Sequence, residues 1–322
     1  MSRRQIQPGS IGFMTIASLA SLGIGSYASA QPLPGESLKF QQLPLGGLLT
    51  NAASVYPGHD ELSTASLNTA QQFTGTFAAD DFSDNVTSPV VDVQWWGSYI
   101  NSSAAPGKVQ DFLISFESDV PAGPAGGFSH PGSVLSSQVV AAGALAPASG
   151  TFTEAPVPSV PGPDGQLYQY NAELAAPFPE QAGVTYWLKI VALTGPNNPT
   201  EWGWHNRDYT QLDPYAAAPG DSLLGTNDIG QPVYHYLDDA VTGSVTYTPG
   251  IPPPQNLIET GFTPLLYSSN PSIDGFGATG VIPPSEDLAF SLYYSNVPEP
   301  TTAGLVVVSG VGILARRRRR IN

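Results

Sequence analysis

The sequence contains no cysteine. This absence excludes disulfide bonds, thiolate catalysis and cysteine-ligated zinc, so the packed core alone must hold the fold together. Charged residues are also scarce, at 11% of the chain, against a usual level of about 25%. Hydrophobic residues nevertheless make up 41% of the chain, which is too much for a disordered protein. We therefore expect a folded domain that is rich in turns.

Basic residues are nearly absent from the middle of the chain. Residues 31–296 contain only Lys39, Lys108, Lys189 and Arg207, against 25 acidic residues, which gives a formal net charge of −21. This charge argues against a nucleic-acid partner, because phosphate binding requires a positive surface. The acidity favours solubility and mutual repulsion outside the cell, and cation binding is the alternative.

The first 30 residues have the three regions of a secretory signal peptide. Two arginines near the start are followed by an apolar stretch over residues 11–24, and the small residues Ala28 and Ala30 then form a cleavage pattern. We predict a signal helix that directs the chain to Sec-type export and is removed after Ala30. A buried amphipathic helix is the alternative.

The last 26 residues carry three features in a fixed order. Pro298, Glu299 and Pro300 precede an uncharged apolar stretch at residues 301–315, and five arginines follow: Arg316, Arg317, Arg318, Arg319 and Arg320. A helix over residues 301–315 spans only about 22 Å, short of a ~30 Å hydrocarbon core, so its membrane contact is expected to be transient. The arginines stay on the cytoplasmic side, which places the domain outside.

This tail resembles the PEP-CTERM sorting signal, with Pro298, Glu299 and Pro300 at the positions of its Pro-Glu-Pro motif. The resemblance implies that an exosortase-type transpeptidase removes the tail. The mature protein is then expected at the cell surface or in the extracellular matrix. An ordinary short tail anchor is the alternative.

Several central segments alternate between apolar and polar residues with a period of two, which is typical of strands. These segments are residues 91–95, 112–117, 185–192, 245–247 and 288–294. Clusters of Gly, Pro, Asn and Asp separate them. The pattern predicts an all-β fold, an antiparallel and jelly-roll-like β-sandwich flanked by the N-terminal signal helix and the short C-terminal membrane helix.

We divide the chain into four parts on this basis. Residues 1–30 are the signal peptide, residues 31–70 a poorly structured entry segment, residues 71–296 the sandwich domain, and residues 297–322 the sorting signal. The motifs at residues 79–82, 95–99, 186–188 and 202–204 resemble an uncharacterised domain of exported bacterial surface proteins. That resemblance implies no activity.

Candidate binding residues are aromatic and acidic. Trp96, Trp202 and Trp204 are candidates for a platform that stacks on sugar rings, and burial in the core is the competing interpretation. Asp80, Asp81 and Asp84 form a weak candidate calcium site, because calcium takes six to eight oxygen ligands. Solvated acids at strand ends are the alternative, and no other cofactor is expected.

No arrangement of residues indicates catalysis. The four histidines lack the spacing of a zinc motif, and no nucleophile elbow is present. We therefore expect a non-catalytic protein that takes part in adhesion or associates with exopolysaccharide. The alternatives are a polysaccharide hydrolase that uses acidic residues and a purely structural matrix component.

Overall fold

The computed structural model describes most of the region between the two predicted sorting segments. The described residues are 31–45, 58, 60–100, 108–123, 127–157, 166–196, 198, 200–209, 221–226, 232–265 and 286–296. The predicted signal helix and the predicted membrane helix lie outside them. In the described part of the chain, no helix is long and apolar enough to cross a membrane.

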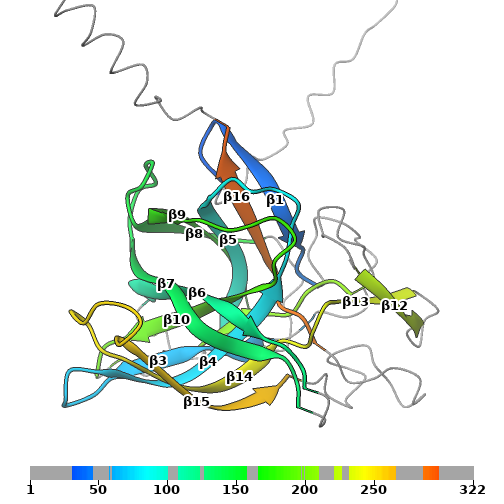
Figure 1. The fold of residues 1–322 in the computed structure, drawn as a ribbon. Coiled ribbons are helices and arrows are strands. Elements are labelled where there is room, and N and C mark those ends of the chain that lie inside the picture. The colour runs from blue at the N-terminus through cyan, green and yellow to red at the C-terminus, as the bar shows by residue number, and fades with distance from the viewer. Residues whose placement is uncertain are drawn as a thin grey trace, which may run out of the picture.

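The described part is built from strands joined by turns and loops, so the prediction of an all-β fold is confirmed (Figure 1). The strands are β1 (Glu36–Gln42), β2 (Asp60–Leu62), β3 (Thr64–Leu67), β4 (Phe73–Phe82), β5 (Val90–Tyr99), β6 (Asp111–Val120), β7 (His130–Ala142), β8 (Thr151–Pro156), β9 (Leu167–Phe178), β10 (Tyr186–Thr194), β11 (Trp202–His205), β12 (Asp221–Thr226), β13 (Pro232–Tyr236), β14 (Val241–Tyr247), β15 (Leu257–Pro264) and β16 (Phe290–Ser295).

Most of these strands belong to one large mixed sheet. Its order is β1-β16-β5-β9-β8-β7-β6-β10-β3-β4-β14-β15, with β10 also paired to β4, and β11 bridges β5 and β2. Strands β12 and β13 form a separate two-stranded sheet. Two pairings are parallel, β3 with β10 and the short contact of β7 with β8, whereas the sequence predicted antiparallel pairing throughout.

The main core cluster draws side chains from many strands of this sheet. Trp95 on β5, Tyr170 on β9 and Phe290 on β16 belong to the same buried cluster as Phe112 on β6 and Leu188 on β10. Trp95 stacks on Tyr170 with ring centroids 5.3 Å apart and meets Phe112 edge to face at 5.2 Å. The burial of these aromatic rings supplies much of the packing free energy that a chain without disulfides needs.

The segment 31–70 differs from its prediction. Strand β1 pairs with β16, β2 pairs with β11, and β3 pairs with β10 and β4. These strands were missed because they are short, or because their apolar residues are too few to show a clear period. Residues 46–57 and 59 lie outside the described part, so the prediction is not tested there.

Two glycines allow β5 and β11 to pass close to one another. A Cβ atom on Gly97 would lie 2.2 Å from the carbonyl oxygen of Gly203 and 2.4 Å from the ring of Trp202. A Cβ atom on Gly203 would lie 2.7 Å from the Cβ of Asp60. Trp202 of β11 therefore lies beside Gly97 of β5, a position that has no side chain.

We predict that Gly97→Ala lowers the free energy of unfolding by about 1–3 kcal/mol, because the new methyl group must displace backbone or a buried ring. Thermal denaturation of the variant measures the loss. Gly195→Ala is the matched control, since a Cβ there meets nothing within 4 Å. Equal melting temperatures for the two variants would contradict the close approach.

Candidate functional site

All five tryptophans are buried, including the three that were predicted to form a sugar-binding platform. Trp96 is 1% exposed, and Trp202 and Trp204 are 0% exposed. The indole nitrogen of Trp202 donates to the hydroxyl of Tyr170 at 3.1 Å, and that of Trp204 donates to the carbonyl of Ala289 at 2.8 Å. These three rings form part of the core, so they are not placed to stack on a ligand.

The three candidate calcium ligands do not converge on one point. The carboxylate of Asp80 accepts hydrogen bonds from the backbone N–H groups of Asp81 and Leu288, at 2.9 and 2.7 Å. Asp81 is the next residue of the same strand and therefore points to the opposite face. Asp84 lies beyond the strand end, where one oxygen accepts from the backbone N–H of Val86 and the other lies 3.6 Å from Lys39 Nζ.

A different set of acids does come together. One carboxylate oxygen from each of Glu36, Asp92 and Glu173 lies within 4.8 Å of the others. Asp92 on β5 and Glu173 on β9 are direct cross-strand partners, while Glu36 begins β1. We call these three residues the carboxylate triad. Like charges directly opposite one another on neighbouring strands are destabilising, so this register requires a compensating interaction.

The triad is largely removed from water. Asp92 is 0% exposed and Glu173 is 1% exposed. The side-chain amide of Asn171 donates to Asp92 Oδ2 at 2.5 Å, and the backbone N–H of Leu33 donates to Glu36 Oε2 at 2.9 Å. Asp92 Oδ1 and Glu173 Oε1 are buried oxygens that accept no hydrogen bond from a described residue outside the triad.

Burial raises the pKa values of all three carboxyl groups. Burial is the larger cause for each residue, and the neighbouring acids add to it for Asp92 and Glu173. The pKa of Glu173 rises to about 8, that of Asp92 rises well above its usual range, and that of Glu36 is also raised. Such shifts mean that the folded protein, without a bound cation, favours the protonated form of these carboxyl groups.

The four basic residues of the domain are engaged elsewhere. Lys39 lies with Asp84 and Glu180, Lys189 with Glu117 and Glu259, Arg207 with Asp287, and Lys108 with Glu154. The first three basic side chains are buried, and Lys108 is 65% exposed. The acidic excess seen in the composition therefore becomes a local group of carboxyls without a basic partner at the triad.

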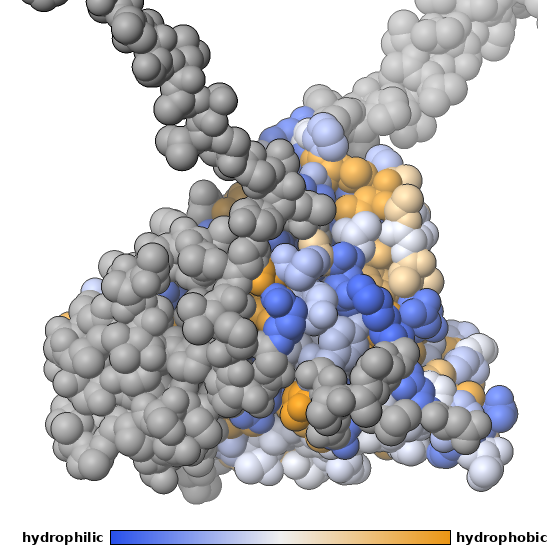
Figure 2. Space-filling model, turned by 180° about the vertical axis from the view of Figure 1, so that it is seen from behind, coloured by the Kyte–Doolittle hydropathy of each residue, from blue (hydrophilic) through white to orange (hydrophobic). Residues whose placement is uncertain are grey.

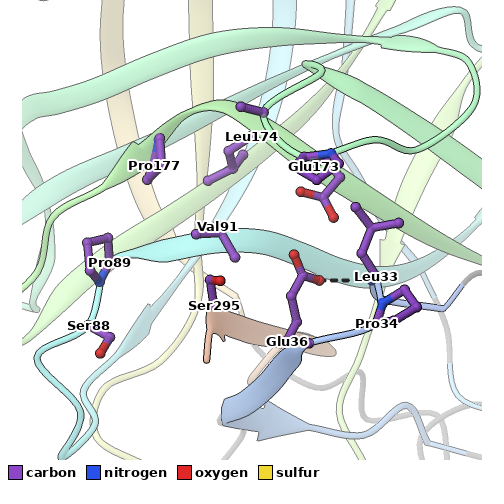
Figure 3. Close-up of a pocket in the computed structure, with 13 residues that line it drawn as sticks. Leu33, Pro34, Glu36, Ser88, Pro89, Val91, Glu173, Leu174, Pro177 and Ser295 are labelled. Carbon is purple, nitrogen blue, oxygen red and sulfur yellow. Dashed lines mark hydrogen bonds between the residues drawn. The ribbon is translucent and has the colours of Figure 1, made fainter. Parts of the chain in front are cut away.

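A pocket of about 620 Å³ opens beside the triad (Figure 3). Glu36 and Glu173 line it, and Figure 3 shows their carboxylates pointing toward one another. Its other walls are mainly small and apolar: Leu33, Pro34, Gly35, Ser88, Pro89, Val91, Pro147, Ala148, Leu174, Pro177 and Ser295. On the back of the molecule, Figure 2 shows hydrophobic residues gathered near the upper end of the domain. The pocket gives small solutes and water a route to two of the three carboxylates.

Sequence reasoning missed the triad because each member looks ordinary by itself. Asp92 occupies a polar position of an alternating strand, which is typical of a solvent-facing acid. Glu173 lies about 80 positions further on, and only the register of β5 with β9 sets the two side by side. The excess of acids over basic residues was the one available signal, and it does not identify the residues.

The fold and the site define an all-β domain with a buried carboxylate triad beside a small apolar pocket. Residues 38–242, more than half of the chain, match the family model described as a domain of unknown function, DUF7901. The chain therefore belongs to this family. No curated protein and no solved structure matches the chain.

Proposed function

We propose that this protein is exported, sorted through its C-terminal tail and retained at the cell surface or in the extracellular matrix as a non-catalytic β domain. The leader, with its cleavage pattern at Ala28 and Ala30, directs export by Sec-type machinery. Pro298, Glu299 and Pro300 are then recognised by an exosortase-type transpeptidase. The tail holds the chain at the membrane only until it is processed.

The observation that carries this proposal is the pairing of the first strand with the last. Glu36 at the start of β1 lies opposite Ser295 at the end of β16, so both ends of the described domain leave from one edge (Figure 1). The last described residue, Asn296, precedes the Pro-Glu-Pro motif by a single residue. Removal of the leader and the tail would therefore leave the whole described sheet intact.

The burial of all five tryptophans favours a structural matrix role over sugar recognition through an aromatic platform. Exopolysaccharide binding would need surface groups other than Trp96, Trp202 and Trp204. None of the described residues that line the pocket beside the triad is aromatic, so they offer no ring on which a sugar could stack. We therefore assign the domain a scaffolding role in the matrix, in which a stable, acidic and non-catalytic body is the useful property.

We also propose that the large sheet forms the two layers of a jelly-roll-like β-sandwich. The main core cluster supports this assignment, since it joins side chains from β1, β16, β5, β9 and β8 with side chains from β6, β10 and β4. Two faces that share one core in this way correspond to sheet-on-sheet packing.

The sorting proposal predicts a defined mature C-terminus. Mass spectrometry of the protein recovered from the producing cells is expected to show a chain without Arg316–Arg320, located at the surface or in the matrix. Replacement of Pro298, Glu299 and Pro300 by alanine is expected to leave the full tail in place and to hold the protein in the membrane fraction. Replacement of Thr301 and Thr302 by alanine is the control. A surface-exposed protein that still carries the arginines would refute processing.

A polysaccharide hydrolase is the second candidate, because Glu36 and Glu173 both line the pocket. Such an enzyme would use this carboxylate pair for acid–base chemistry on a glycosidic bond. We expect no release of reducing ends when the full-length protein is incubated with the exopolysaccharide of the producing cells. Release that disappears in Glu173→Gln would replace the structural assignment with the enzymatic one.

A further inference from the structure

We propose that Glu36, Asp92 and Glu173 bind a divalent cation of the calcium class, with water completing the coordination from the adjacent pocket. This inference does not depend on the sorting proposal, because it rests only on the folded domain. The site is distinct from Asp80, Asp81 and Asp84.

The first argument is the direction and isolation of the buried oxygens. The side chain of Glu173 is almost fully buried, its carboxylate points toward that of Glu36, and its Oε1 accepts no hydrogen bond from a described residue outside the triad (Figure 3). Asp92 Oδ1 is also buried, and it also accepts no hydrogen bond from a described residue outside the triad. An ionised carboxylate oxygen is costly to bury without a partner, so a cation that takes these two oxygens as ligands would remove that cost.

The second argument is that the protein does not supply that partner. Lys39 Nζ, which lies three positions from Glu36, is already surrounded by oxygens of Asp84, Glu180, Val86 and Ser88. The other basic residues of the domain lie with acids outside the triad. A bound cation would balance the carboxylate charge of the triad, for which the described part of the chain supplies no basic side chain.

The third argument is geometric. Calcium ions bind carboxylate oxygens at about 2.3–2.6 Å, so two ligand oxygens of one ion lie at most about 5 Å apart. The oxygens of the triad lie within 4.8 Å of one another, which allows all three to contact a single ion. With oxygen ligands only, the set selects a hard cation and disfavours zinc or copper. The open pocket supplies the water ligands that a three-carboxylate site still requires.

Cation binding would also secure the edge of the sheet. The triad joins β1, β5 and β9, and β16 lies between β1 and β5 in the strand order. An ion held by Glu36 and Asp92 therefore links the two strands on either side of β16. We expect the occupied site to stabilise the part of the domain where the described chain begins and ends.

Calcium titration of the full-length chain, purified in mild detergent, tests the proposal. We expect saturable binding of one ion and a higher melting temperature in about 1 mM CaCl₂, in the range of extracellular calcium sites, than in EGTA. Asp92→Asn and Glu173→Gln are each expected to weaken binding by about tenfold or more. Glu201→Gln, an exposed acid with the same charge change, is the control and should bind calcium as the unmodified chain does.

Melting temperatures measured both in EGTA and in calcium separate cation binding by the triad from a purely structural role of its acids. In EGTA, Asp92→Asn should be at least as stable as the unmodified chain, because it removes repulsion with Glu173. In calcium, the unmodified chain should be more stable than Asp92→Asn. Terbium luminescence gives an independent readout, since Tyr293 on β16 pairs with Asp92 on β5 and can sensitise an ion at the site. Absence of saturable binding, or calcium stabilisation that is unchanged in both triad variants, would overturn the proposal.

Discussion

Replacement of Lys189 by methionine is expected to lower the free energy of unfolding by about 3–5 kcal/mol. Lys189 Nζ donates to Glu117 at 2.7 Å and to Glu259, and it lies 4.3 Å from the ring centroid of Phe77. Its side chain and that of Glu117 are 0% exposed. Methionine keeps most of the length of the side chain but removes the charge, which leaves two buried carboxylates without their cation. Denaturant unfolding at neutral pH measures the loss.

Lys108→Met is the matched control. The side chain of Lys108 is 65% exposed and pairs with Glu154, so solvent screens the interaction and the expected loss is below about 1 kcal/mol. Adding Glu117→Gln and Glu259→Gln to Lys189→Met should restore part of the stability, because the unpaired charges are then gone. If the Lys189 and Lys108 variants unfold at the same denaturant concentration, the buried contacts of Lys189 contribute no more to the free energy of unfolding than the exposed pair of Lys108.

The fold class could be predicted because its signal is local. Residues 91–95 alternate strictly, and in the structure Val93 and Trp95 enter the main core while Asp92 and Gln94 lie on the other face of β5. Strand β7 was missed, because its apolar residues occur in adjacent pairs, Val-Leu, Val-Val and Ala-Ala, and therefore give no period of two. Its neighbours β6 and β8, and not its own composition, hold it in the sheet.

The candidate site could not be predicted, because it depends on burial and register, which the sequence does not report. An acid beside Trp95 looks solvent-facing until the structure shows that the outer face of β5 is buried too. In the same way, Trp96, Trp202 and Trp204 could be grouped by type, but whether they face water depends on strands that lie far apart in sequence. Composition predicted an excess of acids, and the structure shows where part of that excess is left without a basic partner.

The largest effect of solution conditions is expected from pH. In EGTA, the melting temperature should fall as the pH rises from about 5 to 9. Burial raises the pKa of Glu180 to about 8 and that of Glu259 to about 7, even though Lys39 and Lys189 oppose the shift. Between the ordinary carboxyl pKa and these values, the folded state holds protons that the unfolded state has released. Stability from these groups is therefore present at low pH and lost as the pH rises through the folded-state pKa.

Each such carboxyl contributes a slope of at most about 1.4 kcal/mol per pH unit, so two that titrate together over the same range produce a steep profile. Asp287 acts in the opposite sense: burial raises its pKa, but His235 and Arg207 outweigh burial and hold the pKa below its usual value, so its contribution is lost only in acid. Glu180→Gln should flatten the alkaline part of the profile, whereas the exposed Glu201→Gln should not. A melting temperature that rises from pH 5 to 9 would mean that these acids are already ionised in the folded protein, with their charges balanced by the buried lysines.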